Sequence, residues 1–290
     1  MTPANPHPCD GTDRTPLAPL LAEATSDLSA AGVDSPRVDA ELLAAYVLGV
    51  DRGRLVVIAA IRREQAGRLA ALVRRRAQRI PLQHLIGTAA FRHLDLAVGD
   101  GVFVPRPETE LLAGWGIAHT PPGATVVDLC SGTGAIALSV ADEAAPARVI
   151  AVERSPAALQ FLRRNAAGTG VEVVAGDVTE PDLLAELDGA VDVVLCNPPY
   201  VPEGTALPPE VADHDPAEAV FGGADGLAVI RPVIALAARL LRAGGVVGIE
   251  HDDVHADAAP ALLRADGRFA DVAEHADLAG RPRYATARRM

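Results

Sequence analysis

The residues best suited to chemistry are Asn197, Pro198, Pro199 and Tyr200, which directly follow the apolar run at residues 191–196. A proline pair cannot continue a strand, and the residue before each proline is held in extended backbone, so these residues predict a stiff corner at a strand end. The side-chain carbonyl of Asn197 and the backbone carbonyl of Pro198 can both accept hydrogen bonds from one flat NH2 group, and Tyr200 offers a face for stacking. We therefore expect a socket for a planar amide or an exocyclic amine.

A second motif is the glycine-rich turn after the apolar run at residues 125–129. Gly132 and Gly134 let the backbone approach a ligand closely, and the helix expected to follow offers unpaired N–H groups to an anion. Glu153 ends the next expected strand, where a carboxylate can accept both hydroxyls of a ribose. Together these features predict a cofactor of adenosine type. The residues expected to bind it are the strand-end acid, the turn and the second acid: Asp128, Cys130, Ser131, Gly132, Thr133, Gly134 and Glu153.

The glycine turn does not by itself identify the cofactor. Residues 132–137, Gly-Thr-Gly-Ala-Ile-Ala, also satisfy the dinucleotide pattern G-x-G-x-x-A. From the turn alone, a nicotinamide enzyme and a glycine turn without any ligand therefore stay open.

The elements that must position these motifs fall into three regions. Apolar residues at helical spacing predict a bundle of three to five helices between residues 17 and 80, and short alternating runs at residues 85–104 predict a β-hairpin. Beyond residue 105 strand and helix patterns alternate, which predicts a mostly parallel sheet covered on both faces. Strands are expected at residues 125–129, 148–152, 171–175, 191–196 and 246–250, with a final pair near 268–273 and 283–287. Ligands bind at the carboxyl ends of such strands, where both motifs lie.

Composition limits the classes of function. The net charge of -12 argues against bulk attraction to nucleic acid, although the arginine-rich stretch at residues 62–79 indicates either a solvated face or a docking surface. The three cysteines have no metal-like spacing, so we expect neither a disulfide framework nor a metal site. No apolar stretch is long enough to span a membrane, and residues 1–16 indicate a floppy tail and not a signal peptide. A cytoplasmic location follows by default.

Two features favour one class of cofactor. Asp128 lies just before the glycine turn, and an acid in that position is typical of S-adenosylmethionine methyltransferases. Residues 197–200, which follow the fourth strand, are typical of the methyltransferases that methylate amines. The chain resembles the peptide chain release factor N(5)-glutamine methyltransferases, the HemK-type protein glutamine methyltransferase family, from its helical region to its C-terminus. The resemblance rests on the glycine turn and on residues 81–87, 103–110, 197–200, 207–211, 215–216, 222–227 and 277–281.

The resemblance implies an α/β fold of the class I S-adenosylmethionine-dependent methyltransferases. This fold is Rossmann-like, with a mostly parallel seven-stranded sheet, and a small N-terminal helical bundle is joined to it by a β-hairpin. The implied parts are a disordered tail, a helical substrate-recognition domain, a hairpin connector and a methyltransferase catalytic domain, at residues 1–16, 17–82, 83–106 and 107–290. The implied reaction is methyl transfer from S-adenosyl-L-methionine, leaving S-adenosyl-L-homocysteine, to the glutamine amide of the Gly-Gly-Gln motif in class 1 release factors of bacterial type. The implied reaction requires neither a membrane nor direct contact with nucleic acid.

The resemblance also implies roles for single residues. The residues expected to act in catalysis are Asn197, Pro198 and Tyr200. These three are also expected to contact the substrate, together with Pro199, Phe103 and Arg106. The residues expected to bind the cofactor, given above, are joined by Asp177, Val178 and Asn197. Two positions depart from the family pattern. Cys130 replaces a usual glycine, so it must avoid or tolerate positive φ, and Val178 replaces a common aromatic residue, so it offers adenine an apolar contact without stacking.

Other acceptors fit the same socket. A glutamine of a ribosomal protein requires the same chemistry, and the exocyclic amine of adenine is also flat. Methylation of adenine N6 would need a way to flip the base out and usually a sizeable basic recognition region. A non-enzymatic adaptor that binds the cofactor and leaves the socket unused is a third class.

Overall fold

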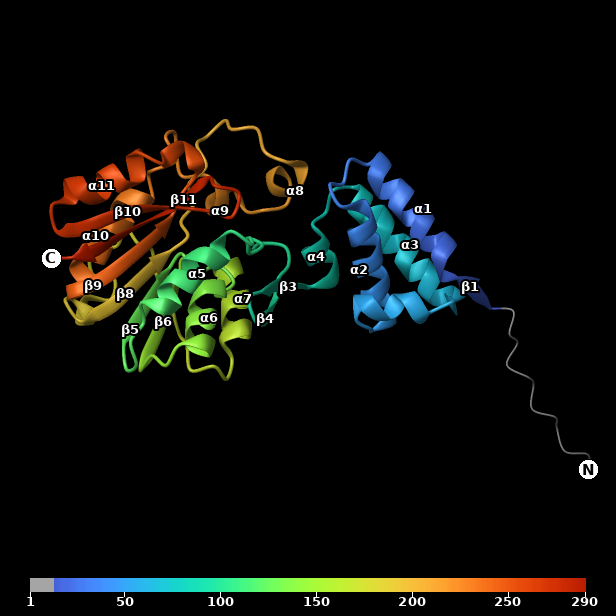
Figure 1. Ribbon diagram of the computed structural model, residues 1–290, viewed down its shortest axis with the longest axis horizontal. Coiled ribbons are helices and arrows are strands. Elements are labelled where there is room, and N and C mark those ends of the chain that lie inside the picture. Colours follow the sequence, from blue (N-terminus) through green and yellow to red (C-terminus); the bar gives the residue numbers. More distant parts are fainter. Residues whose placement is uncertain (1–12) are drawn as a thin grey trace, which may run out of the picture. The chain divides into compact units, whose positions relative to one another are not determined.

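The computed structural model describes residues 13–290, and the chain divides into two compact units, one ending at Ile86 and the other spanning Gly87–Met290 (Figure 1). Most of the tail expected at residues 1–16 lies outside the described residues. Arg14–Pro16, however, form strand β1, which pairs antiparallel with β2 (Ala60–Arg62). The expectation of a disordered tail is wrong for these residues, because a ladder to a strand far along the chain holds their backbone.

The first unit is a helical bundle. Its elements are α1 (Leu17–Ala30), α2 (Pro36–Leu48), the 3-10 helix η1 (Arg52–Val57), α3 (Arg63–Ala77) and α4 (Leu82–Ile86). Leu28 of α1, Leu43 of α2 and Leu69 of α3 belong to one apolar core. Beside this core, Asp39 and Arg76 form a buried ion pair with an O–N distance of 2.7 Å, which connects α2 to α3.

The hairpin expected within residues 83–106 is formed by β3 (Thr88–Phe91) and β4 (Leu94–Ala97), which pair antiparallel in the second unit. The chain after β4 packs against the second unit through Val98, Val102 and Val104, which share a small core with Ala158. Apolar contacts therefore hold the segment after the hairpin in the second unit.

The second unit is built on a seven-stranded sheet of order β10-β11-β9-β8-β5-β6-β7. Its strands are β5 (Thr125–Leu129), β6 (Arg148–Glu153), β7 (Glu172–Ala175), β8 (Val191–Cys196), β9 (Leu241–Glu250), β10 (Phe269–Ala276) and β11 (Pro282–Arg289). Strands β9, β8, β5, β6 and β7 run parallel, whereas β11 runs antiparallel to both of its neighbours. The expected mostly parallel sheet is confirmed.

Successive residues of the central strands enter two separate cores. Val126 packs with the helices on one face of the sheet, whereas Val127 and Leu129 pack with those on the other face (Figure 1). The first face carries α5 (Thr109–Ala118), α6 (Ala135–Glu143) and α7 (Pro156–Ala166); the second carries α10 (Ile230–Leu240) and α11 (Ala258–Asp266). Because both faces are covered, a ligand must bind at the strand ends. The strand order reverses beside β5, which makes the carboxyl ends of β5 and β8 the expected place.

The remaining short elements lie in the loops of the second unit. They are η2 (Ala185–Leu187), α8 (Pro209–Ala212), α9 (Ala217–Val220) and η3 (Asp253–His255). An isolated bridge between Val201 and Phe221 closes the base of the long segment that carries α8 and α9. Among the described residues, no helix combines the length and the apolar character needed to cross a membrane.

Candidate functional site

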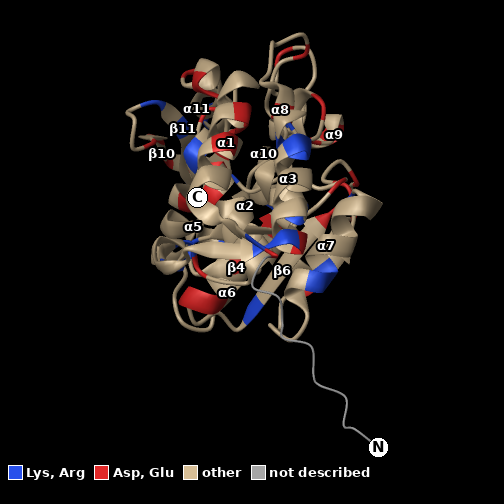
Figure 2. Cartoon of the chain, turned by 90° about the vertical axis from the view of Figure 1, so that its right-hand side faces the viewer, with Lys and Arg blue, Asp and Glu red and all other residues tan. Residues whose placement is uncertain are grey.

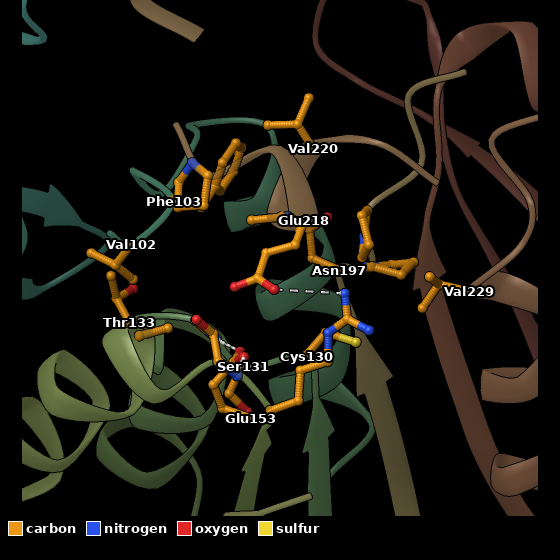
Figure 3. A pocket seen from close by; sticks show the side chains of 18 of the residues that line it. Val102, Phe103, Cys130, Ser131, Thr133, Glu153, Asn197, Glu218, Val220 and Val229 are labelled. Carbon is orange, nitrogen blue, oxygen red and sulfur yellow. Dashed lines mark hydrogen bonds and ion pairs between the residues drawn. The ribbon is translucent and has the colours of Figure 1, made fainter. Parts of the chain in front are cut away.

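A cavity of about 330 Å³ opens at the carboxyl ends of the central strands (Figure 3). Leu129 pairs with Val152 on β6 and with Cys196 on β8, so the chain leaves these three strands side by side. The predicted site residues that line the cavity are Phe103, Arg106, Asp128, Cys130, Ser131, Gly132, Thr133, Glu153, Asp177, Val178, Asn197, Pro198, Pro199 and Tyr200. The sheet therefore brings nearly all of them together, although their individual roles remain predictions.

Gly134 is not among the lining residues. It caps the N-terminus of α6 with φ +85°, and a Cβ atom added there would lie 2.7 Å from Cδ1 of Leu162 on α7. We therefore assign the need for glycine at this position to backbone conformation and helix packing.

The glycine turn is held by Glu153. Oε2 of this residue accepts the N–H of Gly132 at 2.8 Å, and Oε1 accepts the N–H of Ser155 at 2.7 Å. Each carboxylate oxygen keeps a further lone pair for a ligand hydroxyl. Cys130 adopts a left-handed φ of +58°, so the residue that replaces the usual glycine tolerates that backbone conformation.

Asp128 is the next-to-last residue of β5, before the turn, and is almost fully buried. Its Oδ2 accepts the N–H of Ala137 at 3.2 Å, whereas its Oδ1 has no hydrogen-bond partner among the described residues. Burial raises the pKa of this carboxyl to about 7. A buried carboxylate oxygen without a partner, on a residue that lines the cavity, fits a cationic ligand group.

The wall beside β6 and β7 carries two charged residues that the sequence analysis did not select, Arg154 and Glu218, next to the predicted Asp177. Nη1 of Arg154 lies 3.2 Å from Oδ2 of Asp177, and Nη2 lies 4.0 Å from Oε2 of Glu218, drawn as a dashed line in Figure 3. The other carboxylate oxygen of Asp177 accepts the N–H and the hydroxyl of Thr179 at 2.9 and 2.7 Å. Asp177 thus orders its own turn, and Val178 beside it adds a buried apolar surface to the cavity.

The socket at residues 197–200 is supported by two groups that the sequence analysis did not assign. Nδ2 of Asn197 donates to Oγ1 of Thr109 at 3.1 Å, and the hydroxyl of Tyr200 donates to Oε1 of Glu250 at 2.9 Å. Burial, reinforced by Glu250, raises the pKa of Tyr200 well above its usual value, so the phenol stays a donor. The position of Glu250 in the sequence could have indicated this role, because it ends a buried strand and a carboxylate there rarely lacks a polar partner.

The mouth of the cavity is formed by the segment before α5 and the segment around α9; in Figure 3, Phe103 and Val220 lie opposite Glu153. The guanidinium of Arg106 lies 4.7 Å from the ring centroid of Phe103 and forms an ion pair with the buried carboxylate of Asp215. Arg106 therefore connects the two segments, and a substrate contact would use its remaining N–H groups.

Other reactive groups are scarce. Within residues 13–290, no cluster of three or more His, Cys, Asp or Glu side chains is arranged to hold a metal ion. Cys130 and Cys196 are both free thiols, and burial raises the pKa of Cys196 well above its usual value. We interpret Cys196 as a packing residue, whereas Cys130 also lines the cavity.

Two family models match the chain in order along the sequence. The model described as PrmC N-terminal domain matches residues 19–87, and the Methyltransferase small domain matches residues 109–213. The second match contains β5, the glycine turn and residues 197–200, which form much of the cavity.

Curated relatives match nearly the whole chain. The release factor glutamine methyltransferase of Mycolicibacterium smegmatis is 59% identical over 277 residues, covering 95% of this chain and 99% of that protein. That of Mycobacterium tuberculosis strain H37Rv is 50% identical over 277 residues, with 94% and 89% covered. A 4-amino-L-phenylalanine/4-methylamino-L-phenylalanine methyltransferase of Streptomyces pristinaespiralis is 42% identical over 263 residues, with 87% and 89% covered. With two family models matched and nearly its whole length shared with such relatives, the chain belongs to the release factor glutamine methyltransferase family.

Proposed function

We propose that this protein transfers the methyl group of S-adenosylmethionine to the side-chain amide nitrogen of the glutamine in the Gly-Gly-Gln motif of bacterial-type class 1 release factors. The observation that carries the proposal is the socket. One N–H of the Asn197 amide donates to Thr109, and the acceptor that Asn197 can offer to a substrate is its carbonyl oxygen. With the carbonyl of Pro198, this gives two acceptors for the two hydrogens of one planar amide.

The residues around the glycine turn fit the cofactor. Asp128 has a buried oxygen free for the ammonium group of the methionine part, and Glu153 keeps lone pairs for the ribose hydroxyls. Val178 is buried on the cavity wall and offers an apolar surface for adenine. When bound, S-adenosylmethionine supplies a methyl group that is already strongly electrophilic.

The protein's contribution to the reaction is then mainly positioning. An amide nitrogen is a poor nucleophile because its lone pair is delocalised into the carbonyl. Acceptors that hold both amide hydrogens favour a geometry in which this lone pair points toward the methyl donor. Well-oriented partners gain on the order of 7 to 11 kcal/mol, so no general base needs to act before the methyl group is transferred.

We further propose that the helical unit recognises the release factor. Arg63, Arg68, Arg74 and Arg75 of α3 are exposed, and Figure 2 shows the basic residues along this helix. An exposed cationic face of this kind favours an acidic partner surface. Because release factors act on ribosomes, we place the reaction in the cytoplasm.

Label transfer from methyl-labelled S-adenosylmethionine tests the acceptor. The purified protein is offered a release factor with Gly-Gly-Gln, the same factor with Gly-Gly-Ala, ribosomal proteins, DNA, RNA and 4-amino-L-phenylalanine. The last arm is included because one relative acts on that aromatic amine by name. We expect label in the Gly-Gly-Gln factor alone. Equal labelling of the Gly-Gly-Ala factor, or faster labelling of another acceptor, would show that the proposed acceptor is wrong.

The Asn197→Ala variant tests the socket itself. The variant removes one hydrogen-bond acceptor for the substrate amide, so the rate of methyl transfer should fall at least about 100-fold. It keeps the charged side chains that are proposed to bind the cofactor. Affinity for S-adenosylhomocysteine, measured by calorimetry, should change little. Wild-type turnover in this variant would mean that the socket is misassigned.

A further inference from the structure

The mouth of the cavity is spanned by the ion pair between Arg106 and Asp215. Arg106 precedes α5 and lines the cavity, whereas Asp215 lies between α8 and α9 on the other segment of the mouth. The two partners differ in burial, because the side chain of Asp215 is only 1% exposed and that of Arg106 is 32% exposed. A buried anion thus holds a cation that reaches the cavity.

We propose that Asp215 is a positioning residue for the acceptor, which holds the Arg106 guanidinium where it donates hydrogen bonds to main-chain carbonyl groups of the peptide that carries the glutamine. This inference rests on the proposed function and goes beyond it. It names a group that recognises the peptide around the reacting amide, and the buried residue that fixes this group.

The guanidinium has hydrogen-bond donors left for such a peptide. Among the described residues it bonds Asp215 alone, through Nη2, so Nε and Nη1 keep their N–H groups. A guanidinium only donates hydrogen bonds, so its partner in the substrate must be an acceptor. The glycines of a Gly-Gly-Gln segment have no side chains, and their carbonyl oxygens are the acceptors that the segment offers beside the glutamine.

Arg106 is held from two directions. Its guanidinium carbon lies 4.7 Å from the ring centroid of Phe103, so the aromatic ring covers one face of the guanidinium, and Asp215 holds one edge. A guanidinium that is both stacked and paired keeps its other edge in one direction. Such an ordered donor loses less conformational entropy when a substrate binds than a free arginine side chain does.

Asp215 is fixed in turn by the segment that carries it. The bridge between Val201 and Phe221 closes the base of this segment, and the N–H of Asp215 donates to the carbonyl of Val211 at 3.1 Å. Oδ1 of Asp215 has no hydrogen-bond partner among the described residues. The buried charge of this carboxylate therefore depends on its pairing with Arg106.

A second ion pair on the same segment is expected to contribute less. Nη2 of Arg154 lies 4.0 Å from Oε2 of Glu218, and both side chains are about half-exposed. Exposed pairs contribute little because water screens the two charges. Of these two pairs, the buried one is therefore expected to hold the segment at the mouth.

Replacement of the buried pair by leucine, singly and together, tests the proposal. Arg106→Leu and Asp215→Leu should each raise the KM for the Gly-Gly-Gln release factor about 10- to 100-fold, as expected for loss of a hydrogen bond from a charged group. The double variant should show no larger rise than either single variant, since Arg106 acts only where Asp215 holds it. The kcat and the affinity for S-adenosylhomocysteine should each stay within about threefold, because the socket and the glycine turn are unchanged.

Stability in urea separates positioning from a purely structural role. Arg106→Leu leaves a buried carboxylate without its cation and should unfold at a lower urea concentration than the wild-type protein. The double variant replaces the ion pair with two apolar side chains and should regain much of that stability. Its KM should stay raised despite this recovery. If the KM instead returned to the wild-type value together with the stability, the pair would be purely structural and the proposal would be overturned.

Glu172→Gln is the matched control. Glu172 begins β7 and bonds Arg148, which begins β6, at 2.7 and 2.8 Å, and neither residue lines the cavity. This variant should therefore keep the wild-type KM for the release factor.

A further variant keeps the test decisive if Asp215→Leu folds poorly. Asp215→Asn removes the charge at nearly constant size and should also raise the KM for the release factor. An unchanged KM in whichever of these two variants is folded would overturn the proposal. If the wild-type protein transfers no label to the release factor, the proposed function has failed instead, so the two failures are distinguishable.

Discussion

The buried carboxyl of Asp128 predicts a pH-dependent affinity for the cofactor. Burial raises its pKa to about 7, and one of its oxygens has no partner among the described residues. If this oxygen holds the ammonium group of the ligand, Asp128 must be charged in the complex. Below pH 7 the protein must therefore lose a proton when the ligand binds. The α-amino group of the ligand stays protonated over the same range, so it does not mask the effect.

The size of the effect follows from the pKa. Each pH unit below the pKa of the free protein costs about 1.4 kcal/mol, a factor of ten in affinity. With a pKa of about 7, affinity for S-adenosylhomocysteine should fall roughly 25-fold between pH 7.5 and pH 5.5, and nearly one proton should be released per ligand at pH 6. Isothermal titration calorimetry in buffers of different ionisation enthalpy measures both quantities.

Two variants identify the group that titrates. Asp128→Asn should bind more weakly and lose the pH dependence, whereas Glu250→Gln should keep it, although burial raises the pKa of Glu250 to about 7 as well. Protonation of Asp128 at low pH does not itself unfold the protein. A carboxyl whose pKa is raised on folding contributes stability that is complete below its unfolded pKa and is lost as pH rises through 7. Affinity that stays constant from pH 5.5 to 7.5, or proton uptake on binding, would refute the assignment of Asp128.

Two further predictions concern the glycine turn and the acid that holds it. Glu153→Ala removes the acceptor of the Gly132 and Ser155 N–H groups and of the ribose hydroxyls, so S-adenosylhomocysteine should bind about 10- to 100-fold more weakly by calorimetry; unchanged binding would count against the ribose role. Gly134→Ala should lower the free energy of unfolding by about 2 to 4 kcal/mol in urea, because it adds contact with Leu162 at 2.7 Å to the strain of positive φ. Gly123→Ala, with φ +80° and open space, should cost only about 1 to 2 kcal/mol; equal costs would mean that packing is irrelevant.

The sequence was sufficient where local chemistry decides the structure. Strand and helix patterns predicted the parallel sheet and the bundle. The motifs at residues 130–134 and 197–200 predicted where the cavity lies, because strand ends meet at one edge of a parallel sheet. The strand at Arg14–Pro16 was not predictable in this way. Its partner, β2, lies far along the chain, and its three residues carry no apolar alternation.

The groups that support the site from behind could not be predicted from the sequence either. Thr109 and Glu250 come from a helix and a strand that no local motif connects, and Arg154 was overlooked beside the more conspicuous Glu153. The place where α5 begins brings Thr109 to Asn197, and the register of β8 with β9 brings Glu250 to Tyr200; both are tertiary facts. A pattern in the sequence can name a group that touches a ligand, but it does not show which distant group orients it.

The difference between groups that contact the reacting NH2 group and groups farther away also bears on which acceptor is methylated. Two acceptors and an aromatic face recognise a flat NH2 group, and an amide and an arylamine both present one. A relative 42% identical to this chain is named for an aromatic amine, so overall similarity at that level does not fix the acceptor. Discrimination must then come from contacts with the rest of the substrate, outside the socket. In the second unit the segments placed to make such contacts are those that Arg106 and Asp215 join at the mouth of the cavity. If the acceptor is a protein glutamine, substitutions at this mouth should alter selection between acceptors, whereas substitutions in the socket should slow transfer to all of them.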